Sequence, residues 1–161
     1  MTNAKSFAEM NTLHEILAVA IADMKLGLED EAVDFNMQHW HRPNGKGVCV
    51  ICMAGAVIHY SLAEILTRRA FLSPSSFRQE IRYRLFALND LRSGSISQAQ
   101  FSLHYCNQRL KVENRDKAIE LERKWFSRMM PEVALAKGKE ETKKMIFLLE
   151  EMHLDLKAAN I

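Results

Sequence analysis

The sequence predicts a mainly α-helical protein that folds as a single domain, residues 1–161, of about five or six helices. The chain of 161 residues is long enough to bury one hydrophobic core. Its 48% hydrophobic and 26% charged residues are typical of a globular protein and exclude wholesale disorder. Only six glycines and three prolines are present, which favours long helices over a turn-rich β fold.

An acidic N-terminal helix is expected over residues 7–27. Apolar residues recur there at helical spacing and form one stripe: Leu13, Ile16, Leu17, Ala20, Ile21 and Met24. Thr12 and Glu15 have the spacing of a capping box, and Gly27 is placed to end the helix.

One short extended segment is expected near residues 32–40. Apolar and polar residues alternate there from Val33 to His39, which is the pattern of a strand. Trp40 follows and is expected to anchor the segment against the core, because one large aromatic side chain buries much area.

A central helix is expected over residues 48–66. Pro43, Gly45 and Gly47 form a turn before it, and no proline interrupts the run that follows. Its small residues share one helical stripe and predict close approach by another helix: Cys52, Gly55, Ala56 and Ala63. Polar residues such as His59 and Glu64 interrupt the run, so it is not expected to span a membrane.

The remaining helices are marked by start and stop signals. Ser73–Pro74 predicts a helix start and Gly94 a stop, followed by a shorter helix over residues 95–105. Residues 107–116 have the composition of a linker, and the next helix, over residues 118–130, is expected to end before Pro131. A C-terminal helix is expected over residues 139–158.

Charge is distributed unevenly along the chain. Residues 1–35 carry two basic and seven acidic side chains, whereas residues 36–112 carry ten basic and three acidic ones. The basic middle third is a candidate surface for an anionic partner, including nucleic acid, or it is neutralised by the acidic N-terminal segment. The candidate partner-binding residues are Arg68, Arg69, Arg78, Arg82, Arg84 and Arg92.

Cys49 and Cys52 form a C-x-x-C pair that allows several interpretations. In one interpretation they are buried structural cysteines, and no metal, cofactor or catalytic group is assigned. In another, they bind zinc together with His39 or His41. His59 lies seven residues beyond Cys52, about 10 Å along a helix axis, which is too far to join easily.

Two further interpretations give these cysteines reactive chemistry. The pair could be a redox dithiol, although the strand that usually precedes such a motif is not found. Alternatively, Cys49 is a nucleophile with His39, His41 or His104 as its base. The usual phosphate, dinucleotide and hydrolase motifs are absent from the sequence, so an enzyme is not the leading expectation.

Two stretches, FNMQHW followed by CVICMAGAV, and RLFALNDLRSGSISQAQ, together cover residues 35–100. They resemble segments of small bacteriophage and prophage proteins to which no activity is assigned. The resemblance implies an accessory protein that binds a host protein or complex, with inhibition of host defence as one candidate role and a homodimer as a further expectation. It implies the cytoplasm of a bacterial host cell. The odd number of three cysteines and the absence of a secretory signal also favour the cytoplasm.

Overall fold

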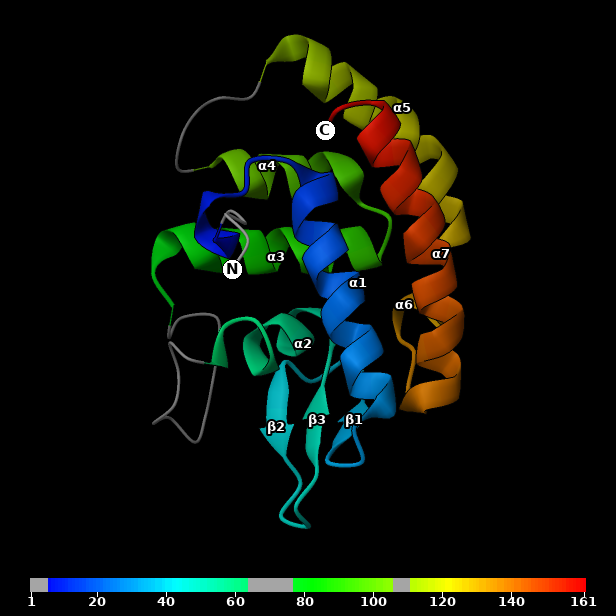
Figure 1. The fold of residues 1–161 in the computed structure, drawn as a ribbon. Helices are drawn as coiled ribbons and strands as arrows, with labels where there is room; N and C mark the ends of the chain where they lie inside the picture. Colours follow the sequence, from blue (N-terminus) through cyan, green and yellow to red (C-terminus); the bar gives the residue numbers. More distant parts are fainter. Residues whose placement is uncertain (1–5, 64–76, 106–110) are drawn as a thin grey trace.

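Helices make up most of the structure, and a small three-stranded sheet lies at one end of them (Figure 1). The computed structural model describes residues 6–63, 77–105 and 111–161. Within these ranges the helices are the short 3-10 helix η1 (Phe7–Glu9), α1 (Leu13–Glu29), α2 (Met53–His59), α3 (Gln79–Arg92), α4 (Ile96–His104), α5 (Val112–Arg128), α6 (Pro131–Ala134) and α7 (Gly138–Ala158). The strands are β1 (Val33–Phe35), β2 (His41–Pro43) and β3 (Cys49–Ile51).

The predicted fold class is confirmed: the protein is mainly helical and forms one domain. Helix α1 lies beside α7, and α3 and α4 cross behind α1 (Figure 1). One continuous core runs between these helices and includes Leu17 and Met24 of α1, Leu88 of α3, and Leu149 and Met152 of α7. The described part of the chain holds seven α-helices, and the one beyond the expected five or six is the single turn α6.

The N-terminal segment differs from the single helix predicted over residues 7–27. Phe7–Glu9 is a separate 3-10 turn, and α1 begins at Leu13, where the Thr12 hydroxyl accepts a hydrogen bond from the Glu15 backbone N–H. The helix continues past Gly27 to Glu29, so Gly27 does not end it.

The later helices follow the predicted order with shifted ends. Gly94, with φ of +76°, lies between α3 and α4 as the sequence predicts. Helix α5 begins at Val112, inside the predicted linker, and α7 closely matches the predicted range 139–158. The predicted helix start at Ser73–Pro74 lies outside the described residues.

The sheet has the strand order β1-β3-β2 and confirms an extended segment near residues 32–40. Strand β3 pairs in parallel with β1 and antiparallel with β2. A short turn joins β2 to β3. In this turn the side-chain oxygen of Asn44 accepts hydrogen bonds from the backbone N–H groups of Lys46 and Val48.

The central helix predicted over residues 48–66 is wrong on both sides of Met53–His59, because residues 60–63 are not α-helical either. Cys49–Ile51 is strand β3, and α2 begins at Met53 and ends at His59. Cys52 caps the helix, because its Sγ accepts a hydrogen bond from the Gly55 N–H at 3.3 Å. Residues 64–66 of the predicted helix lie outside the described residues.

The close approach predicted from the small residues of this segment does occur at Gly55, but the neighbour is not a helix. A Cβ added to Gly55 would lie 1.5 Å from the Trp40 carbonyl oxygen. The backbone that precedes β2 therefore packs directly on α2.

No helix in the described ranges is both long enough and apolar enough to cross a membrane.

Candidate metal centre

The sheet brings His41 and Cys49 together from two neighbouring strands. In the antiparallel pairing of β2 with β3, His41 lies opposite Ile51 and Pro43 lies opposite Cys49. Side chains two residues apart on a strand point to the same face, so His41 and Cys49 are diagonal neighbours on one face. The distance from Cys49 Sγ to His41 Nε2 is 3.4 Å.

Helix α2 adds His59 to the same face of the sheet. His59 is the last residue of α2, and its Nδ1 lies 3.0 Å from Nε2 of His41. One donor atom from each of the three side chains lies within 4.8 Å of the other two. Among the described residues, His41, Cys49 and His59 are the group of histidine, cysteine or acidic side chains that lie close enough together to hold one metal ion.

All three side chains are partly buried, which disfavours their charged forms. Burial lowers the pKa of His41 and of His59, and the neighbouring His59 lowers that of His41 further. Burial raises the pKa of the Cys49 thiol. The group therefore consists of two neutral imidazoles and a thiol, and it lacks the imidazolium that would stabilise a thiolate nucleophile.

Tyr60 and Asp30 border the three side chains. The Tyr60 ring packs edge-on against the His59 ring, with 4.8 Å between their centroids, and its hydroxyl donates a 2.7 Å hydrogen bond to Asp30 Oδ2. This hydrogen bond holds the pKa of Asp30 below its usual range. A carboxylate is thus fixed near His59, where it favours a bound cation.

Cys52 does not belong to this group, although the C-x-x-C spacing predicts that both cysteines act together. Its side chain is buried, and its sulfur caps α2 and lies 3.9 Å from the Trp40 carbonyl oxygen. Cys49 lies on a strand and Cys52 at a helix cap, so the two thiols have different surroundings and different roles.

The other histidines suggested by the sequence also lie elsewhere. His39 borders a hollow of about 320 Å³ together with Arg42 and Val50, whose side chains project from the opposite face of the sheet. His104 ends α4, which lies among the helices far from the sheet (Figure 1). His59, which the sequence argument set aside, is the histidine that joins Cys49.

The expectation that His59 lies too far from the cysteines is wrong because it assumed a helix from residue 48 onward. With a helix from residue 48 onward, Cys49 and His59 would lie far apart along one axis. Val48, Val50 and Ile51 are β-branched residues directly after a glycine turn, which is also the signal of a short buried strand. This signal places Cys49 before the helix and allows α2 to fold back over the sheet.

Of the four predicted partner-binding arginines that the structure describes, three donate hydrogen bonds within the protein. Arg84 is buried and donates hydrogen bonds to the carbonyl oxygens of Met10 and Glu80, so its guanidinium is not available to a partner, contrary to the expectation from the sequence. Arg92 donates to the carbonyl oxygens of Met37 and Ala134 and so joins α3 to two distant segments.

The other arginines of the predicted set are placed differently. Arg82 is partly buried and donates to the Phe77 carbonyl oxygen, whereas Arg78 is exposed. Arg68 and Arg69 lie outside the described residues. Binding of a host protein or of nucleic acid through these arginines stays a prediction, and among the described residues it depends mainly on Arg78.

Comparison with protein-family models, with curated proteins and with solved structures found no match. The geometry of His41, Cys49 and His59 is therefore the main evidence for function.

Proposed function

We propose that this protein binds a transition-metal ion, with zinc as the best fit, through His41, Cys49 and His59. The observation that carries the proposal is the convergence of one sulfur and two nitrogen donors from β2, β3 and α2 within 4.8 Å of one another. Three separate elements supply these donors, so the arrangement is a product of the whole local fold.

The donor set and its spacing suit zinc. Cysteine sulfur and histidine nitrogen are common zinc ligands, with bonds of about 2.3 Å and 2.0–2.1 Å in tetrahedral geometry. Such bonds place two ligand nitrogens about 3.3 Å apart and a sulfur and a nitrogen about 3.6 Å apart. Here His41 Nε2 lies 3.0 Å from His59 Nδ1 and 3.4 Å from Cys49 Sγ, close to these values, and the third pair of donors lies within 4.8 Å.

The contacts among the three donor atoms also favour a metal ion. His41 Nε2 lies within hydrogen-bonding distance of both Cys49 Sγ and His59 Nδ1. Binding an ion would direct all three donor atoms at one centre and release the thiol proton. The predicted location, a reducing bacterial cytoplasm, would keep Cys49 reduced for this purpose.

Three protein ligands leave the fourth zinc position to water or to a ligand. No fourth histidine, cysteine or acidic side chain joins the group within the described ranges. Three-ligand sites with an open position are typical of catalytic zinc, whereas structural sites are closed by four protein ligands. The proposal therefore includes a reactive metal-bound water as the chemistry that this site would support.

Metal analysis of the purified protein tests the proposal. We expect about one zinc per chain by mass spectrometry of the metal content, and binding of zinc to the metal-free protein by calorimetry. His41→Ala, Cys49→Ser and His59→Ala should each weaken zinc binding at least about tenfold, since loss of a ligand is more severe than loss of an outer partner. In a cobalt-substituted protein, the charge-transfer absorption of the thiolate should disappear in Cys49→Ser.

His39→Ala and Cys52→Ser are the matched controls, because the C-x-x-C interpretation makes these residues ligands and the structure does not. Both variants should keep zinc at the level of the unmodified protein. Circular dichroism would verify that every variant is folded. The proposed site would be overturned if folded Cys49→Ser and His59→Ala retained zinc. It would also be overturned if only the two control variants lost zinc.

A further inference from the structure

Helix α5 carries two apolar stripes, and only one of them faces the core. Ala118 and Trp125 are fully buried against the rest of the protein. A second stripe, formed by Val112, Ile119 and Phe126, is exposed by 63%, 40% and 63%. Its members are seven residues apart, which is the spacing of a seam between two helices. We call this stripe the outer stripe of α5.

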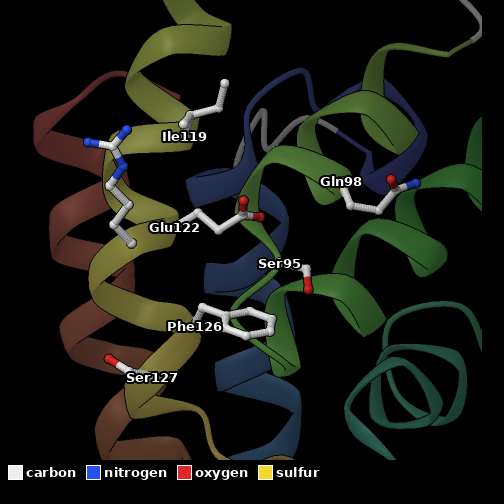
Figure 2. A pocket seen from close by; sticks show the side chains of 7 residues that line it. Ser95, Gln98, Ile119, Glu122, Phe126 and Ser127 are labelled. Atoms are coloured by element: carbon white, nitrogen blue, oxygen red, sulfur yellow. The ribbon is translucent and has the colours of Figure 1, made fainter.

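A groove runs beside the outer stripe, between α5 and the start of α4 (Figure 2). Its volume is about 610 Å³, and Ile119, Phe126 and Arg123 of α5 line it together with Ser95 and Gln98 near α4. Figure 2 shows the Phe126 ring reaching from α5 towards Ser95. Ile119 and Phe126 thus belong both to the exposed apolar stripe and to the lining of the groove beside it.

The groove has a fixed wall. Glu122 extends from α5 towards α4, where its carboxylate accepts hydrogen bonds from the Ser97 N–H at 3.1 Å and the Ser97 hydroxyl at 2.9 Å. This carboxylate lies at the N-terminal end of α4, where negative charge is favourable. The two helices are joined at this point, so the groove is formed before any partner arrives.

Charges next to the outer stripe are arranged so that the surface complements itself. A second hollow shares Ile119 and Arg123 with the groove and adds Asp116 and Glu120. Asp116 lies three residues before Ile119 and Arg123 four residues after it, so two copies of α5 in antiparallel contact near Ile119 would place Arg123 of each copy near Asp116 of the other. No ion pair involving these three charged residues occurs within the described part of the chain.

We propose that the outer stripe of α5 and the adjoining groove bind the same surface of a second copy of this chain, with the two α5 helices antiparallel. A two-fold contact requires one patch to carry both the projecting group and the hollow that receives it. The outer stripe meets this requirement, because in an antiparallel contact centred on Ile119 the Phe126 of each copy faces Val112 of the other. Arg123 and Asp116 supply matching charges at the same contact. The residues involved are separate from His41, Cys49 and His59, so this inference does not depend on metal binding.

Sedimentation velocity over a concentration series tests the contact. The unmodified protein should show a monomer–dimer equilibrium, unchanged when a chelator removes bound metal. Ile119→Glu with Phe126→Glu should shift it towards monomer by at least about tenfold, because four carboxylates would then be buried at one contact. The matched control is Phe147→Glu with Leu154→Glu on α7, where both apolar side chains are similarly exposed and the dimer should be unaffected.

A charge exchange tests the antiparallel arrangement. Arg123→Glu should weaken the dimer at least about tenfold, since it places like charges opposite each other. Combining it with Asp116→Arg and Glu120→Arg reverses the three charges next to the outer stripe in both copies and should restore most of the lost affinity. A monomer at all concentrations would overturn the inference, as would a dimer that resists Ile119→Glu with Phe126→Glu or a charge exchange that fails to restore binding.

Discussion

Asp23 is a buried carboxyl group whose burial lowers the free energy of unfolding at neutral pH. It lies on α1, is only 6% exposed, and accepts a hydrogen bond from the Ser61 hydroxyl. Burial raises the pKa of Asp23 from 3.8 to about 6, and the hydrogen bond from Ser61 opposes this only in part. The folded protein therefore holds the Asp23 proton more tightly than the unfolded chain does.

The sign of the pH dependence follows from this difference. Well below pH 3.8 both states are protonated and Asp23 has no effect on the free energy of unfolding. As the pH rises from 3.8 to about 6, the unfolded state ionises first, so the free energy of unfolding falls. At one unit of pKa per 1.36 kcal/mol, the loss above pH 6 is up to about 3 kcal/mol.

We therefore expect Asp23→Asn to be more stable than the unmodified protein at pH 7.5, by about 1–3 kcal/mol, and nearly equal to it at pH 3.5. Urea unfolding of both proteins at several pH values measures the difference. Glu31→Gln, which removes an exposed carboxylate, should change stability by less than about 0.5 kcal/mol. A gain from Asp23→Asn that is the same at every pH would contradict the assignment.

At the scale of elements, the position of α2 depends on direct contact with the backbone before β2. Gly55 is inside the helix, where glycine costs about 1 kcal/mol relative to alanine if nothing else intervenes. Its place is explained by the Trp40 carbonyl oxygen, which occupies the volume that a Cβ would need. Because His59 ends the same helix, this contact also places the third donor of the candidate metal centre.

Gly55→Ala should therefore lower the free energy of unfolding by about 3 kcal/mol or more, because α2 or the Trp40 backbone must move to admit the methyl group. Helix propensity alone predicts the opposite sign, a gain of up to about 1 kcal/mol. Ala22→Gly at an exposed position of α1 measures that propensity independently. Chemical denaturation of both variants decides between the two expectations, and a stabilised Gly55→Ala would show that the contact is not tight.

At the scale of the whole molecule, the proposed ion would join elements that come from different parts of the fold. His41 on β2, Cys49 on β3 and His59 on α2 span the sheet and the helix that covers it. The unfolded chain does not hold the three donors together, so zinc would bind the folded state preferentially. Preferential binding of this kind raises stability by an amount set by the ligand concentration and its dissociation constant.

Zinc at about 100 times its dissociation constant should raise the free energy of unfolding by about 2.7 kcal/mol relative to the chelated protein. Urea unfolding with zinc and with chelator gives this difference. The gain should persist in His39→Ala and vanish in Cys49→Ser. An equal gain in Cys49→Ser would mean that zinc stabilises the protein from another place.

The amino-acid sequence by itself determined the helical class and the order of most helices. Apolar spacing and local signals such as Thr12 at the start of α1 act within one or two turns of chain, and the sequence records them directly. An extended segment near Val33 was also predictable, because alternation along a strand is a local pattern.

Only the tertiary structure decided which chemistry-bearing residues meet. The four apolar residues from Val48 to Ile51 fit a buried strand as well as a helix, and pairing with β1 and β2 resolved the choice. That pairing separated Cys49 from Cys52 and brought it to His41, and the contact of Gly55 with Trp40 delivered His59. These are contacts between distant segments, whose energies depend on packing in three dimensions and leave no fixed spacing in the chain.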